Sequence, residues 1–151
     1  MLSEIAHFVK GLDPVADFFS GTVRSDVVDL SQYHKVTFVV YKGVGTTGTS
    51  TLTVEASAGS SPDTVTAIPF RYRAITATDV LGAVTDAAAA GFDTTAGSSQ
   101  LYLIEVDAKA LANLGRNWVT LKAVEVVDSP VVGCILIILT KPRYGAGQVA
   151  I

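Results

Sequence analysis

The chain has 151 residues and a mass of 15.7 kDa, which suits one domain with a core large enough to fold without cross-links. Hydrophobic residues make up 49% of it and charged residues 17%, a composition that excludes a disordered tail or charged linker. The net charge of -3 and eleven scattered basic residues argue against a nucleic-acid partner, since neutralising phosphates needs clustered Lys and Arg.

The first twenty residues show helical spacing. Leu2, Ile5, Phe8, Val9 and Leu12 recur at intervals of three and four, with polar residues between them. This pattern predicts a short amphipathic helix that begins after Ser3 and stops at Gly11. We therefore expect residues 1–21 to form an N-terminal helical arm.

From residue 22 onward the pattern changes to an alternation of β-branched and polar residues, with Gly, Ser, Asp and Pro clusters between the runs. Residues 76–99 are expected to be mostly loop, and residues 107–114 to hold one helical turn. Pro69 predicts an edge or a bulge, because it cannot donate to a ladder. The predicted strands cover residues 22–28, 34–42, 49–56, 65–75, 101–106, 118–127 and 131–140.

The last of these runs, residues 131–140, is apolar at successive positions, so we expect it to be buried on both faces. At nine residues its apolar core, 131–139, is about half the length of a membrane-spanning helix. Residues 1–13 hold no basic segment followed by an apolar run, so no secretory signal is expected. These features predict a soluble, non-secreted protein without a membrane partner.

Short strands without an alternating helix rhythm favour two packed antiparallel sheets. The predicted fold is an all-β, jelly-roll-like antiparallel β-sandwich over residues 22–141, preceded by the helical arm and followed by an extended C-terminal tail at residues 142–151.

A search for chemistry finds no motif. His7 and His34 lie in no nucleophile elbow, and Cys134 lies within the most apolar run. Glu55 and Glu125 are expected to face solvent on their strands, and the aspartates fit no metal-binding loop. We therefore expect no catalytic residues, no cofactor, no metal and no enzymatic activity.

Several blocks of the chain resemble small structural proteins from the head-gene clusters of tailed bacteriophages. They are LSEIAHFVKGLDPVADFFSGTV, SDVVDLSQYHKVTFVVYKGVGTTGTSTLTVEA, IPFRYRA and WVTLKAVEVVDSPVVG. The resemblance implies a capsid decoration or cement protein on the virion's outer shell, assembled in the host cytoplasm. Its partners would be the major capsid protein and further copies of itself, with a trimer favoured. A minor head protein or an adaptor fits the same resemblance.

The expected contact residues are apolar side chains near the two ends of the chain: Leu2, Ile5, Phe8, Val9, Phe18, Phe19, Tyr144 and Ile151. An alternative from another class is a carbohydrate-binding module of sandwich type. It would use aromatic side chains as sugar platforms, and the candidates are Trp118, Tyr72, Tyr102 and Tyr41.

Overall fold

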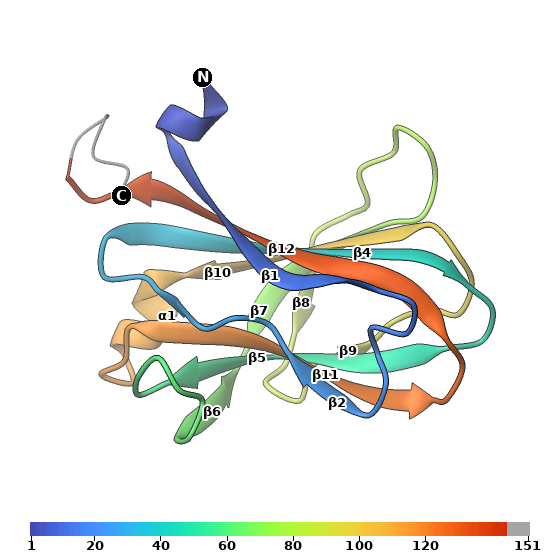
Figure 1. Ribbon diagram of the computed structural model, residues 1–151. Coiled ribbons are helices and arrows are strands. Elements are labelled where there is room, and N and C mark those ends of the chain that lie inside the picture. Colours follow the sequence, from blue (N-terminus) through green and yellow to red (C-terminus); the bar gives the residue numbers. More distant parts are fainter. Residues whose placement is uncertain (145–151) are drawn as a thin grey trace.

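A computed structural model describes residues 1–144 of the chain. It has two antiparallel sheets packed face to face, as Figure 1 shows, so the expected all-β sandwich is confirmed. One sheet has the order β1 (Ala6–Val15), β12 (Val131–Pro142), β4 (Tyr33–Gly45), β10 (Gln100–Asp107), β7 (Phe70–Ile75) and β8 (Thr85–Ala87). Both sheets have six strands; we call this one, in which all six follow a single order, the six-stranded sheet.

The second sheet has the order β2 (Thr22–Arg24), β11 (Trp118–Val127), β5 (Thr49–Ser57) and β6 (Val65–Ile68). Two short strands join its sides: β3 (Val28–Asp29) pairs with β11, and β9 (Phe92–Asp93) pairs with β5. The helical elements are the 3-10 turn η1 (Leu2–Glu4) and the helix α1 (Ala108–Ala112), which fulfils the expectation of one helical turn after β10.

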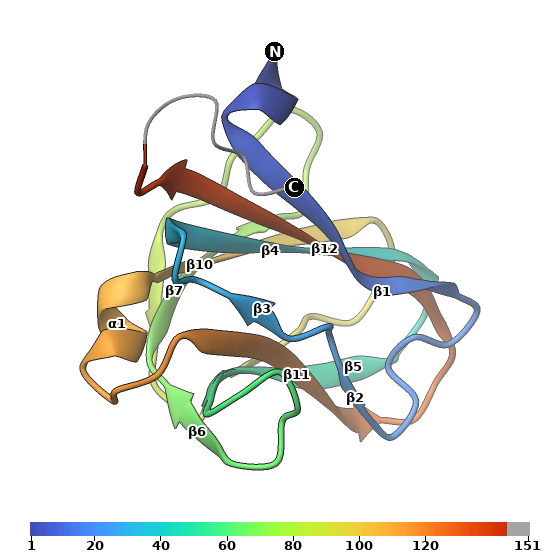
Figure 2. The same cartoon turned by 60° about the vertical axis from the view of Figure 1, so that its left-hand side comes forward.

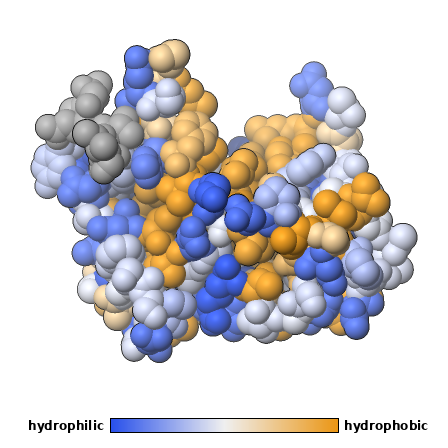
Figure 3. All heavy atoms as spheres, viewed as in Figure 1, coloured by the Kyte–Doolittle hydropathy of each residue, from blue (hydrophilic) through white to orange (hydrophobic). Residues whose placement is uncertain are grey.

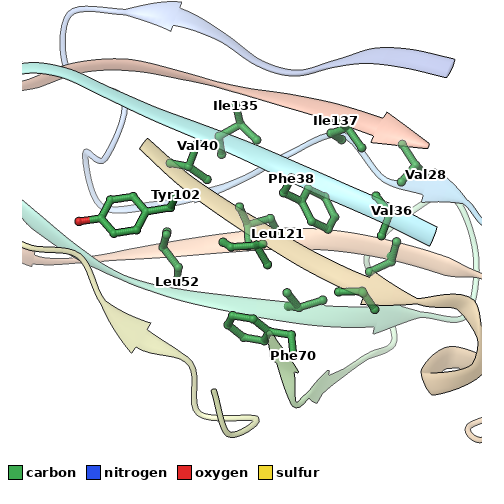
Figure 4. Close-up of a cluster of buried hydrophobic side chains, with 14 of the residues drawn as sticks. Val28, Val36, Phe38, Val40, Leu52, Phe70, Tyr102, Leu121, Ile135 and Ile137 are labelled. Atoms are coloured by element: carbon green, nitrogen blue, oxygen red, sulfur yellow. The ribbon is translucent and has the colours of Figure 1, made fainter. Parts of the chain in front are cut away.

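The core lies between the sheets and is built from alternate residues of each long strand. Figure 4 shows Phe38 of β4 and Ile137 of β12 pointing across to Leu52 of β5 and Leu121 of β11, and all four side chains are fully buried. The predicted strand at residues 65–75 breaks at Pro69 into β6 and β7, which belong to different sheets. The proline thus stands where the chain crosses between sheets.

The expected N-terminal helix is wrong, because residues 6–15 form the edge strand β1. Val9 lies opposite Ile137 and Leu12 opposite Ile135, so both face the interior although they are three residues apart. A register shift between Lys10 and Leu12, at Gly11, makes this spacing. The bulged strand therefore produces the same apolar spacing as an amphipathic helix.

Phe18 and Phe19 also belong to the sandwich and not to an arm. Each is 1% exposed, and their rings stack with centroids 3.9 Å apart. The Phe18 amide donates to the carbonyl oxygen of Val131 at 3.0 Å. The boundary expected at residue 21 is thus wrong, since β1 and the two phenylalanines complete the six-stranded sheet and the core.

Candidate protein-binding surface

The six-stranded sheet carries apolar side chains on its outer side as well as on its inner one. In β12 the residues that alternate with the buried ones are Val132, Cys134, Leu136 and Ile138. The expectation that residues 131–140 are buried on both faces is therefore wrong for this side. No segment among residues 1–144 is long enough, or placed, to cover it as the second sheet covers the other side.

Strand pairing extends these side chains into a continuous surface. Directly paired residues of antiparallel strands point to the same face. Leu136 is paired with Val39 of β4, and Val39 with Leu103 of β10. The same pairing places Lys10 of β1 and Arg73 of β7 on this side, at the two ends of that row. We define the outer apolar face as the apolar side chains on this side of the sheet: Phe8, Val39, Tyr41, Ile75, Leu101, Leu103, Val132, Cys134, Leu136 and Ile138.

The members of this face are accessible to solvent. Phe8, Tyr41, Val132 and Leu136 are between 44% and 50% exposed, and the other members are half-buried by their neighbours on the sheet. With strands about 4.8 Å apart and a rise of about 3.3 Å per residue, the span from β1 to β7 and from Val132 to Thr140 covers about 500 Å² in projection. A patch of this size is at the upper end for a protein that works alone.

Two projections flank the outer apolar face. One is the N-terminal segment, residues 1–5, and the other is the 76–84 loop between β7 and β8. Both rise above the six-stranded sheet on the side away from the second sheet (Figures 1 and 2), and the molecular surface dips between them (Figure 3). Both present exposed apolar side chains, namely Leu2 and Ile5 in the segment, and Val80, Leu81 and Val84 in the loop.

The 76–84 loop is held against the edge of the sheet. Arg73 of β7 donates from Nη1 to the carbonyl oxygen of Gly82 at 2.7 Å. A Cβ atom added to Gly82 would lie 2.0 Å from the carbonyl oxygen of Ala74, so only glycine allows this close approach of the two backbones. The loop is therefore fixed against β7 beside the outer apolar face.

Charged groups border the apolar side chains, and they are paired within the chain. Lys35 Nζ lies 3.4 Å from Glu105 Oε2, and Arg71 Nε lies 2.9 Å from Asp86 Oδ1. The carboxylates of Glu105 and Asp86 are thus each balanced by a basic side chain. A cleft of about 520 Å³ lies among these pairs, between β10, β7, β8 and α1, with Asp107 at its wall.

The structure places the expected contact residues in different surroundings. Leu2 and Ile5 are exposed on the N-terminal segment, and Tyr144 is exposed just after β12. Phe8 lies on the outer apolar face, whereas Val9 faces inward and packs against the core. Phe18 and Phe19 are interior residues, so they are not surface contacts in this structure, and Ile151 lies outside the described residues.

The aromatic side chains expected to form a sugar platform do not share a surface. Tyr102 is 2% exposed, and its hydroxyl donates to Gln100 Oε1 at 2.8 Å. Tyr72 stacks on Phe92 with ring centroids 3.7 Å apart, between the two sheets. Trp118 is half-buried on the second sheet, which leaves Tyr41 as the well-exposed one of the four.

Among residues 1–144, two charged side chains are buried. Glu55, which was expected to face solvent, does point outward from β5 but is 6% exposed, because Arg24 and Lys122 lie over it with ion-pair distances of 3.1 and 3.4 Å. The Lys42 ammonium is buried at the end of β4 and donates to the carbonyl oxygen of Thr95. Loss of hydration on burial lowers the pKa of Lys42.

Other expected chemistry groups are dispersed. Glu125 is half-buried and accepts a hydrogen bond from the Gly21 amide at 2.9 Å, and the His7 ring stacks on Tyr33. Among residues 1–144 no group of three or more His, Cys, Asp or Glu side chains is placed to hold a metal ion. In the same part of the chain, no helix has the length and apolar character needed to cross a membrane.

The outer apolar face as a whole was not predicted from the sequence: among its members only Phe8 was expected to contact a protein partner, and Tyr41 was expected to contact a sugar. The signal was present in the strand at residues 131–140, whose second set of alternate residues is as apolar as the first. The strand at residues 34–42 repeats it with Val39 and Tyr41. No protein-family model matches the chain, and neither the curated proteins nor the solved structures contain a match to it.

Proposed function

We propose that this chain is a non-enzymatic structural protein of a virion, which decorates the outer shell of a tailed-bacteriophage capsid and stabilises the contacts between capsomers. The observation that carries the proposal is the outer apolar face, a set of neighbouring apolar side chains spread over about 500 Å² of sheet in projection. Apolar surface of this extent on a small protein marks a site of contact with other proteins.

The strand pairing supports a jelly-roll fold, which is a common fold of viral capsid proteins. The strands pair in nested order: β1 with β12, β2 with β11, β4 with β10 and β5 with β6. A long hairpin that is folded over on itself produces this nesting. The resemblance to phage head proteins supplies the shell and the major capsid protein as partners.

A decoration protein binds a shell and performs no chemical step, so its contact surface needs a defined shape but no reactive groups. The sandwich provides a rigid body, and the exposed Leu2 and Ile5 extend from it as a short apolar segment. Copies joined in one oligomer would bind several equivalent positions of a shell at once, so a small contact area per subunit suffices for stable occupancy.

The test is co-sedimentation of the purified protein with empty phage capsids that lack it. We expect saturation at a fixed number of copies per capsomer, and weaker binding after removal of residues 1–5. That deletion leaves β1 and the core intact, whereas a deletion of residues 1–20 would remove an edge strand and two core phenylalanines.

The matched control for the deletion is Leu114→Ser, which changes an exposed leucine that lies beyond α1. No binding to any shell, together with retention on a polysaccharide gel that Tyr41→Ala abolishes, would contradict the proposal and support a carbohydrate-binding module.

A further inference from the structure

We propose that the outer apolar face binds a second copy of this chain, so that two six-stranded sheets pack face to face about a two-fold axis. This inference rests on the shape and charge of the face and goes beyond the proposed function. That function requires the outer apolar face only to be a protein contact; the inference assigns the face to a second copy of this chain, so that a shell would contact other surfaces of the pair. It also departs from the trimer that the resemblance implies.

The placement of the two projections favours a second copy as the partner. Ala6, which follows the N-terminal segment, is in register with Lys35 at one end of β4. Ile75, which precedes the 76–84 loop, is in register with Tyr41 near the other end of β4. Since β1 and β7 lie on opposite sides of β4, the projections stand at diagonally opposite corners of the face.

This diagonal arrangement is complementary to itself. A two-fold rotation about an axis along or across the strands, parallel to the sheet, brings the partner's projections down over the two corners that are free. The apolar tips of each projection would then flank the partner's sheet. A flat surface, by contrast, would be held away from the sheet by both projections (Figures 1 and 2).

The centre of the face carries no charge. Leu136, Val39 and Leu103 lie side by side there, and the register places Lys10 and Arg73 at the two ends of the same row. Both cations have a partner within the chain, a carboxylate at 3.6 Å and a backbone carbonyl at 2.7 Å respectively. An apolar centre suits a contact between two copies, because like charges at its middle would repel each other across the axis.

The extent of the face is of the order that a contact between two copies needs. Stable pairs bury about 800 Å² on each partner. The sheet contributes about 500 Å² in projection, which is more than half of that area, and the exposed apolar side chains of the two projections add to it.

The experiment is the mass of the protein in solution, measured by light scattering at concentrations from about 1 μM to about 1 mM. The variant is Leu136→Lys, with Tyr41→Lys as a second substitution at another point of the face. The control is Leu114→Lys, because Leu114 is 45% exposed, close to the 47% of Leu136, but lies off the sheet. Thermal melting of each variant shows that it is folded.

We expect the unmodified protein to reach twice 15.7 kDa and to remain there at high salt, because apolar contacts are not screened. Each substitution on the face should raise the dissociation constant at least about thirty-fold, as for a central contact residue, and the control should leave it unchanged.

A mass of 15.7 kDa throughout, any plateau other than twice that mass, or a pair insensitive to both substitutions would overturn the inference. Binding to capsids by a protein that stays monomeric would leave the proposed function standing, so the two failures are distinguishable.

Discussion

Replacement of Phe18 by alanine distinguishes between a core residue, as the structure places it, and a surface contact, as its position near the N-terminus predicted. The ring is 1% exposed and stacks on Phe19. It also packs directly on the backbone of Gly133, since a Cβ atom added there would lie 2.4 Å from a ring carbon of Phe18. The substitution would therefore leave a cavity in a place that the rigid β12 backbone cannot fill.

The expected loss is about 3–5 kcal/mol of unfolding free energy, as for other buried Phe→Ala changes. For a chain of this length, each kcal/mol corresponds to about 2–4 °C, so the melting temperature should fall by about 6–20 °C. Phe8→Ala is the matched control, because Phe8 is 48% exposed, and it should cost less than about 1 kcal/mol.

The assay is urea unfolding followed by circular dichroism at two protein concentrations, because self-association adds to apparent stability in a concentration-dependent way. The reasoning would be refuted if Phe18→Ala were as stable as Phe8→Ala. In that case Phe18 would act at a partner's surface, as the position near the chain terminus suggested.

Further predictions concern the buried charges. Because burial lowers the pKa of Lys42, the unfolded chain binds more protons than the folded one between that lowered pKa and the ordinary value of 10.5, so the unfolding free energy should rise with pH across this window. Urea titrations between pH 7 and 11 should show that Lys42→Met abolishes the rise, whereas Lys109→Met, at an exposed lysine, keeps it. Glu55→Gln should lower the unfolding free energy by about 1–3 kcal/mol, since it leaves Lys122 and Arg24 without their carboxylate. The surface change Asp86→Asn should lower the unfolding free energy by less than about 1 kcal/mol in the same urea assay, and equal losses for Glu55→Gln and Asp86→Asn would contradict the assignment of Glu55 as a buried partner.

The strands of the sandwich could be predicted where alternation is regular, as at residues 34–42, 49–56 and 118–127. The N-terminal strand could not, because the register shift at Gly11 places Val9 and Leu12 on one face at helical spacing. Spacing alone does not distinguish a bulged strand from a helix; residues 6–15 are a strand because they pair with β12.

The candidate surface was hidden for a different reason. A strand with two apolar faces is typical of burial on both sides, and its sequence does not say whether the second covering layer belongs to the same chain. Alternation did place Glu55 on the outward side correctly. It could not indicate that the stems of Arg24 and Lys122, which come from two other strands, would cover the carboxylate.

The measurement that most directly tests the outer apolar face as a contact surface is the reaction rate of Cys134 with a small thiol reagent. Cys134 is the sole cysteine of the chain and lies on this face, half-buried and beside Tyr41. The account predicts that the rate falls at least tenfold as protein concentration rises through the range where the mass doubles, and that Leu136→Lys restores it. A rate independent of concentration while the protein assembles would place the contact elsewhere and contradict the account.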